Sequence, residues 1–180
     1  AYLGRVQGMS LGQISCYFAI ATGASMTIAA LLGGAIADRA GARNPAYYVL
    51  IPGLGLIAFI PLLLGFTVAH SWQQSLAFLV PAIVFSAIYL VPVLALLQNR
   101  TPAQYRATVS SILLFLLNLI GLGGGPLFIG MISDRLNTEN GPHALGLALQ
   151  WLAPFAIVGA LLFASAAALL WRERQASDTD

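Results

Sequence analysis

Lysine is absent from this chain of 180 residues, and only six residues are acidic. Charged residues make up 8% of the sequence, whereas soluble globular domains carry about 25%. A soluble fold of this length could not cover its surface with so few charges, so an ordinary soluble domain is excluded. The eight basic residues are scattered arginines and the formal net charge is only +2, so a nucleic-acid-binding face is excluded as well.

Cysteine is nearly absent too, because Cys16 is the only one. A single cysteine excludes a disulfide framework and a cysteine-based metal cluster, and we predict neither a metal site nor a cofactor. Cys16 lies in an apolar stretch, where we expect a small buried hydrophobic side chain. A basic leader and a small-residue cleavage site are also missing from the N-terminal residues.

What the sequence has in abundance is apolar residues, at 59%, gathered in five long segments. A helix needs about 20 residues to cross a hydrocarbon core of roughly 30 Å. Strand-like alternation is not seen, and helices or closed barrels are the backbones that satisfy their own hydrogen bonds in lipid. We therefore predict an all-α membrane protein whose five transmembrane helices lie at about Ile14–Ala37, Tyr47–Ala69, Leu76–Leu97, Thr108–Ile132 and Leu145–Leu170.

The placement of arginine predicts how these helices are oriented, since arginine-rich connectors stay in the cytoplasm. Successive connectors alternate sides of the membrane, which puts six arginines on one side (Arg39, Arg43, Arg100, Arg106, Arg172 and Arg174) and two on the other (Arg5 and Arg135). We expect residues 1–13 to form an outer loop that follows a helix missing from this sequence. Residues 14–171 form the helix bundle, and 172–180 a cytoplasmic tail. The expected location is the bacterial inner membrane.

Proline within the predicted helices marks positions where a helix can bend. Each proline removes a backbone donor and clashes with the preceding turn. A membrane helix can simply tolerate such a residue, or the bend can allow one part of the bundle to move. Both interpretations stay open for Pro92, and for Pro52, Pro61 and Pro81.

Glycine is concentrated in the fourth predicted helix. Gly121 and Gly125 share one face, and small residues four apart let a neighbouring helix approach closely. The run of Gly123, Gly124 and Gly125 followed by Pro126 also weakens the helix near its middle. This combination predicts a flexible point in addition to close packing.

Polar side chains inside the helices are few, and they are the candidates for a substrate cavity: Asn118, Tyr89, Ser86, Tyr17, Thr22 and Ser25. The Asn118 amide is the most expensive to place in lipid, because it needs partners. A helix-to-helix hydrogen bond is the alternative for Asn118. A bond to the preceding turn is the alternative for Ser25, and equally for Ser110 and Ser111. Charged residues are absent from the span centres, so no ion relay is visible.

The first arginine-rich connector, residues 33–43, carries the most specific motif. Its sequence contains the residues Gly33, Gly34, Asp38, Arg39, Gly41 and Arg43. Glycines permit tight packing at the membrane edge, while Asp38 can accept hydrogen bonds from a neighbouring helix N-terminus. This pattern resembles the loop motif of the major facilitator superfamily, which recurs between the second and third helices of each six-helix half.

The resemblance implies a fold and a mechanism. The five predicted helices would be helices eight to twelve, most of the C-terminal half of a twelve-helix protein whose halves work by alternating access. Asp38 would then lock one conformation by meeting a helix end in the other half. A finer resemblance to the spinster-like branch is carried by residues 2–12, 105–110 and 118–134, and it implies a lipid-like or amphipathic organic solute. The implied partners are the bilayer, the missing N-terminal half and that solute.

Two other functions have to be compared with a transporter. A membrane enzyme would need a clustered nucleophile, base or metal set. His70 and His143 share the outer side with Asp134 and Glu139, but the H-x-x-x-H spacing of a zinc site is missing. We therefore do not expect an enzyme. A non-transporting receptor or scaffold built on a transporter fold stays possible, because fold does not determine function.

Overall fold

The computed structural model describes residues 11–41, 43–140 and 144–177, and these are helical apart from short connections. No strand occurs in this described part of the chain. Five stretches are long and apolar enough to cross a membrane: Ser15–Gly41, Tyr47–Val68, Trp72–Arg100, Ala103–Leu136 and Ala144–Ala176. The prediction of an all-α membrane protein with five transmembrane helices is confirmed.

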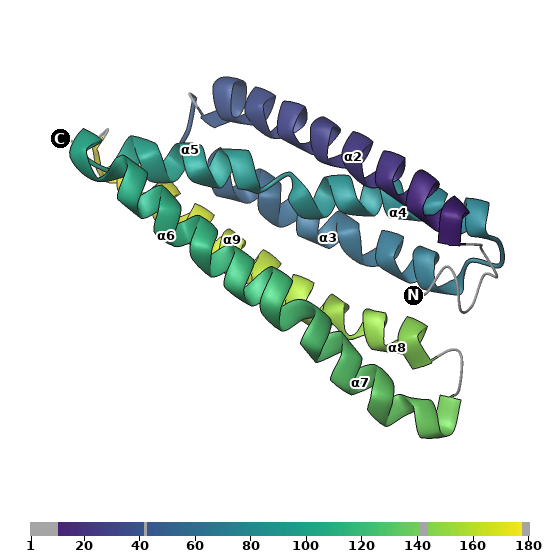
Figure 1. Cartoon of the computed structure of the whole chain (residues 1–180). Helices are drawn as coiled ribbons and strands as arrows, with labels where there is room; N and C mark the ends of the chain where they lie inside the picture. Colours follow the sequence, from purple (N-terminus) through teal and green to yellow (C-terminus); the bar gives the residue numbers. More distant parts are fainter. Residues whose placement is uncertain (1–10, 42, 141–143, 178–180) are drawn as a thin grey trace.

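Helix α3 (Tyr47–Val68) has neighbours on two sides. Helix α4 (Trp72–Ala87) packs against one side and α9 (Leu152–Ser177) against another, while α2 (Leu11–Ile36) packs against α4. Figure 1 shows α2, α4 and α3 lying side by side. Glycine allows the close approach, because a Cβ atom added at Gly55 would lie 3.0 Å from the Phe85 carbonyl oxygen.

The third predicted helix is interrupted. Helix α4 ends at Ala87 and α5 (Leu90–Arg100) begins after a turn at Ile88 and Tyr89, with Pro92 in the first turn of α5. Pro92 has no amide hydrogen to donate to the Ile88 carbonyl, so the α-helical ladder cannot continue there. The helix is therefore interrupted beside Pro92, where we predicted that it could bend. In contrast, α3 runs unbroken through Pro52 and Pro61.

The fourth span consists of α6 (Arg106–Asn118), the π-helical segment η3 (Leu119–Gly124) and α7 (Gly125–Asn140). The π-helix coincides with the glycine run, where we predicted a flexible point. Among the described residues the close packing predicted at Gly121 and Gly125 is not found, because a Cβ atom there would meet nothing within 4 Å. No residue is buried in α6 or η3. Figure 1 shows α6 and α7 along one edge of the bundle.

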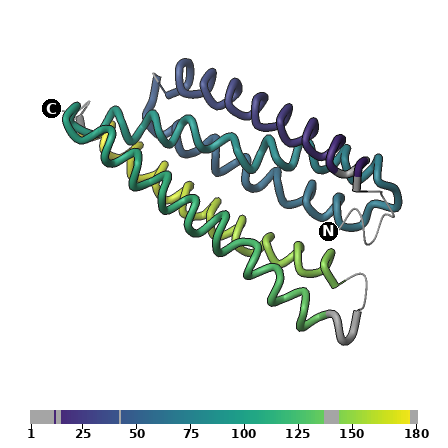
Figure 2. The backbone as a smooth tube through the Cα atoms, in the orientation of Figure 1, coloured from purple at the N-terminus to yellow at the C-terminus, as the bar shows by residue number. Residues whose placement is uncertain are grey.

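The structure corrects the predicted extents of several segments. Helix α7 continues beyond Ile132 to Asn140, because polar residues are compatible with helix and the breakers Gly141 and Pro142 come later. The fifth span divides at Trp151 into α8 (Ala144–Gln150) and α9. Helix α9 extends to Ser177, so the first residues of the predicted tail are helical. The backbone tube in Figure 2 follows these breaks. Within the predicted N-terminal loop, residues 11–13 begin α2, and residues 1–10 lie outside the described part.

Candidate functional site

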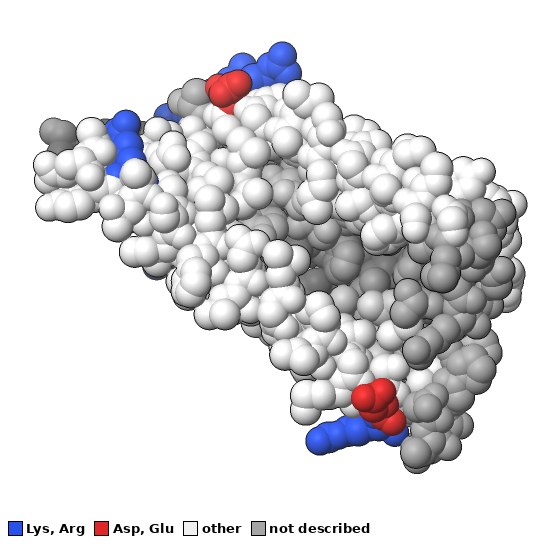
Figure 3. Space-filling view, viewed as in Figure 1, with Lys and Arg blue, Asp and Glu red and all other residues white. Residues whose placement is uncertain are grey.

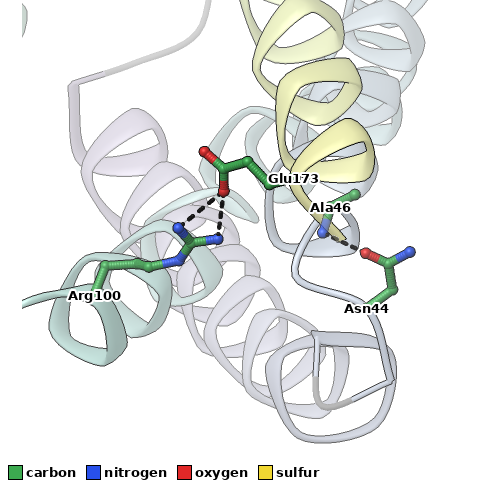
Figure 4. Close-up of polar contacts among 4 residues, drawn as sticks. All are labelled: Asn44, Ala46, Arg100 and Glu173. Carbon is green, nitrogen blue, oxygen red and sulfur yellow. Dashed lines mark hydrogen bonds and ion pairs between the residues drawn. The ribbon is translucent and has the colours of Figure 1, made fainter. Parts of the chain in front are cut away.

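The motif connector begins as a continuation of α2. Residues Ala37–Gly41 form a π-helical turn, η1, which contains Asp38 and Arg39. The chain then reverses in a tight turn in which the Asn44 amide nitrogen donates to the Ala40 carbonyl at 3.1 Å. The buried Asn44 side chain accepts a hydrogen bond of 2.9 Å from the amide of Ala46, the residue just before α3 (Figure 4). Such side-chain bonds to the backbone two residues on define sharp turns.

Gly41 is required by the contact beneath the connector. A Cβ atom at Gly41 would lie 2.2 Å from Cζ of Tyr48, so this position accepts no side chain without movement. The Tyr48 ring is buried, and its hydroxyl accepts a hydrogen bond of 3.4 Å from the Asn99 amide in α5. Gly41 of the connector therefore packs against the Tyr48 ring, and Asn99 of α5 holds that ring through a hydrogen bond.

The end of α9 also reaches the connector. The Arg174 guanidinium donates to the Arg43 carbonyl. Next to it, one carboxylate oxygen of Glu173 accepts from both terminal nitrogens of Arg100, each at 3.0 Å. Figure 4 shows Arg100 and Glu173 pointing toward each other from α5 and α9. Three helices thus meet the connector at one end of the bundle.

The charged side chains of the motif itself point outward. Asp38 and Arg39 are exposed, and within the described residues neither side chain forms a hydrogen bond or an ion pair. Figure 3 shows charged side chains at both ends of this face, with uncharged atoms between them. The connector thus combines a backbone held by hydrogen bonds with exposed charged side chains at Asp38 and Arg39.

The two glycines that precede the connector differ in their surroundings. A Cβ atom at Gly33 would lie 3.0 Å from the Ile88 carbonyl oxygen and 3.2 Å from Cδ of Pro92, whereas Gly34 has nothing within 4 Å. Gly33 thus lets α2 approach the break between α4 and α5. Gly34 has no such role among the described residues.

The six residues predicted to line a substrate cavity form different kinds of contact in the structure. Ser25 is fully buried and donates to the Ala21 and Val80 carbonyls at 2.6 and 3.1 Å, so it joins α2 to α4. Ser86 donates within its own helix to the Ile83 carbonyl at 3.0 Å. The bond to the preceding turn, which was the alternative to a cavity role for Ser25, is present.

The aromatic candidates contact other rings. The centroid of Tyr17 lies 5.3 Å from that of Trp72, and Tyr89 lies 6.5 Å from Phe163 of α9. Thr22 is different, because its hydroxyl oxygen is buried without a hydrogen-bond partner in the described structure. Among the described residues, Tyr17, Tyr89 and Thr22 therefore have different surroundings, and none of the three lines the grooves described below.

Asn118 lies at the exposed end of α6. Its amide donates to the Leu114 carbonyl at 2.7 Å, and no helix-to-helix bond forms in the described part of the chain. Ser111 likewise donates to the preceding turn, at the Ala107 carbonyl, at 2.9 Å. Ser110 instead accepts from Gln98 at 3.2 Å. Both Asn118 and Ser111 are therefore left on the uncovered side of α6.

Cys16 corrects one expectation. Its side chain is exposed rather than buried, because in a membrane helix the outward face is as apolar as the interior. The hydrophobicity of its neighbours therefore could not distinguish a lipid-facing from a core position.

Open apolar grooves lie between α7 and the α8–α9 segment, with volumes of about 360, 350 and 330 Å³. Phe128, Leu136 and Trp151 each line two of them, and none of the six candidate residues lines any of the three. Among the described residues, no three His, Cys, Asp or Glu side chains are grouped as metal ligands would be. His143, which belonged to the enzyme alternative, lies outside the described residues.

Sequence analysis missed Tyr48, Asn99, Arg100, Glu173 and Arg174 as parts of the connector site. Two of them carried a usable signal. Glu173 and Arg100 have opposite charges and lie on the same predicted side of the membrane, so an ion pair between their helix ends was a reasonable hypothesis. Tyr48 and Asn99 carried no such signal, since their contact depends on how α3 and α5 cross.

Comparison with known proteins is consistent with this geometry. The sequence profile of the Major Facilitator Superfamily matches residues 1–180. A protein of Mycolicibacterium smegmatis (strain ATCC 700084 / mc(2)155), described as an MFS-type efflux pump, is 33% identical over 174 residues. These residues are 96% of this chain but 40% of that protein, so the chain spans about two fifths of its relative's length.

Proposed function

Because the chain belongs to the major facilitator superfamily, we propose that it forms most of the C-terminal half of a twelve-helix secondary transporter. The five spans would be helices eight to twelve, and the partner would be an N-terminal half of the same protein. Transport would proceed by alternating access, with one half rocking against the other around a central site.

The observation that carries this proposal is the motif connector. Its backbone is held by the Asn44 turn, by Tyr48 beneath Gly41 and by Arg174, whereas Asp38 and Arg39 are exposed without partners in the described structure. A carboxylate held in this way is available to the N-terminus of a helix in another half, where the helix dipole favours an anion.

The uncovered side of α6 supports the same arrangement. The side-chain amide of Asn118 lies there among exposed apolar side chains such as Leu114 and Phe115. We propose that this side, together with the exposed part of α2 that carries Tyr17, faces the substrate path between the two halves. The apolar surroundings favour an organic solute of lipid-like or amphipathic character, as in the spinster-like branch.

Two further observations support a direction of transport and an orientation in the membrane. The relative's description as an efflux pump favours export. The arginine-rich end contains Arg39, Arg43, Arg100 and Arg174, and such ends stay in the cytoplasm. We therefore propose an exporter in the bacterial inner membrane, with the C-terminus of the chain in the cytoplasm.

The test is transport by the full-length protein reconstituted in liposomes, with a labelled lysophospholipid and a labelled cationic amphipath as probes. We expect accumulation under an imposed gradient, and slower turnover for Asp38→Asn because the connector loses its charge. Asp134→Asn is the matched control, since it removes an exposed carboxylate at the other end of the bundle. Absence of movement of either probe under any gradient would contradict the substrate class. Equal turnover for Asp38→Asn and Asp134→Asn would contradict the mechanism.

A further inference from the structure

We propose that the end of α9, residues 171–174, positions the motif connector and couples it to the cytoplasmic end of α5. In this arrangement Glu173 and Arg174 are positioning residues for the conformational change, and they act through the connector backbone and Arg100. The inference rests on the proposed function, because it assigns a regulatory role within the same transport cycle.

The first contact is between α9 and the connector backbone. Arg174 donates to a carbonyl, that of Arg43, at the point where the chain turns from η1 into α3. Tyr47, the first residue of α3, places its ring 6.0 Å from that of Trp171 in edge-to-face geometry. The end of α9 therefore contacts the connector on both sides of the turn.

The second contact is between α9 and α5. Glu173 pairs with Arg100, the last residue of α5, and both terminal nitrogens of the guanidinium donate to the same carboxylate oxygen. The side chains are 52% and 59% exposed, so solvent screens the pair. Exposed ion pairs contribute little to stability, and one of them can therefore break and re-form in each cycle.

Helix α5 is the element whose position this contact would report. It is separated from α4 by the turn at Ile88 and Tyr89, beside Pro92, so it can tilt without carrying the whole span with it. A tilt of α5 reaches the connector by two routes. One passes through Arg100, Glu173 and Arg174, and the other through the bond from Asn99 to Tyr48 beneath Gly41.

Position within the fold explains why α9 is suited to this role. It packs along α3 over its length, and its buried Ala167 belongs to a core cluster with Ala46 and Val49 at the start of α3. Residues 171–174 of α9 follow directly after this packed segment. Arg172 lies in the same turns, but its side chain makes no hydrogen bond or ion pair with the described residues.

The test is a charge exchange in the full-length transporter. Arg100→Glu and Glu173→Arg each break the pair, and the double variant restores it with the charges reversed. We expect each single variant to shift the balance between inward- and outward-open states by up to about fivefold, which is what the loss of an exposed ion pair can supply, and the double variant to return it toward the parent. Arg172→Glu is the matched control, since it adds the same negative charge in the same turns without breaking a described contact.

The readout is the position of the connector, measured as a distance distribution from a spin label at Ala40 to a second label on the N-terminal half, in a Cys16→Ala background. Arg174→Leu should broaden that distribution, while Arg174→Lys keeps a donor and should narrow it again. The inference is overturned if the single variants match Arg172→Glu, or if the double variant does not recover. These distances are measured without substrate, so a parent protein that transports no probe would contradict the proposed function and leave this test intact.

Discussion

Substitution of Gly41 by alanine is the sharpest test of the connector geometry. The added Cβ atom would lie 2.2, 2.4 and 2.6 Å from Cζ, Cε1 and Cε2 of Tyr48, whereas carbon atoms normally approach to about 3.5–4.0 Å. Either the ring or the connector must therefore move by more than 1 Å, roughly the difference between these distances. The ring cannot swing into solvent easily, because Tyr48 is only 8% exposed and Asn99 donates to its hydroxyl.

The magnitude follows from two opposing effects. Inserting a methyl group into a filled site costs about 1–3 kcal/mol, while replacing glycine by alanine inside a helix gains up to about 1 kcal/mol. We therefore expect Gly41→Ala to lower the free energy of unfolding by up to about 2 kcal/mol, the cost less the gain, and to be about 1–3 kcal/mol less stable than Gly34→Ala. Gly34→Ala receives the helical gain without a clash, because nothing lies within 4 Å of its Cβ position, and it should be neutral or stabilising.

The assay is reversible unfolding of the full-length protein in mixed micelles, with the free energy read from the midpoint and slope. A double-mutant cycle with Tyr48→Leu identifies the cause, since the smaller side chain removes the ring atoms that the new Cβ atom meets. The cost of Gly41→Ala should fall to near zero in that background. The explanation is refuted if Gly41→Ala is as stable as Gly34→Ala, or if its cost is the same with and without the Tyr48 ring.

Three further predictions concern the helix break beside Pro92, the exposed Cys16 and the side-chain amide of Asn118. Pro92→Ala restores a backbone donor for the Ile88 carbonyl and should slow turnover several-fold at unchanged substrate affinity. Pro61→Ala lies in an unbroken helix and should leave turnover unchanged. Equal turnover rates for the two variants would show that transport does not use the break beside Pro92. Cys16→Ala should change the free energy of unfolding by less than about 0.5 kcal/mol, as expected for an exposed position, and a larger loss would mean that Cys16 is covered. Asn118→Leu should raise the KM for the amphipath without loss of stability, because its amide bonds only its own helix within the described residues; a large loss of stability would instead indicate a bond to a helix beyond this chain.

The membrane fold could be predicted from local properties of the sequence. The number of residues that a helix needs to cross a bilayer does not depend on tertiary contacts, and a helix forms all its backbone hydrogen bonds within itself. The five spans could therefore be counted from the sequence. The bend at Pro92 and the weak point at Gly123 were likewise local, because each depends on the backbone chemistry of a few residues. Boundaries set by polarity failed at Ser133, since a polar residue does not end a helix and α7 continues to Asn140.

Side-chain roles were harder to predict, and the reason is the environment. In a soluble protein, a residue whose sequence neighbours are apolar is usually buried, but here Cys16 has apolar sequence neighbours and its side chain is exposed. Ser25 and Asn118 show the same difficulty for polar residues. Both are rare polar groups within apolar spans, yet one is fully buried between α2 and α4 and the other lies on an uncovered face.

The sequence alone determined the class of protein and the number of its spans, and it identified the connector with Asp38 and Arg39 as the most specific motif. It could do so because hydrocarbon imposes the same requirement on every span and because the motif is contiguous. Only the tertiary structure decided what holds that connector. Tyr48, Arg100 and Glu173 are far from one another along the chain, and they come together because α3, α5 and α9 cross at this end of the bundle. Contacts between helix ends depend on packing angles and on breaks such as the one beside Pro92, which no local pattern of residues specifies.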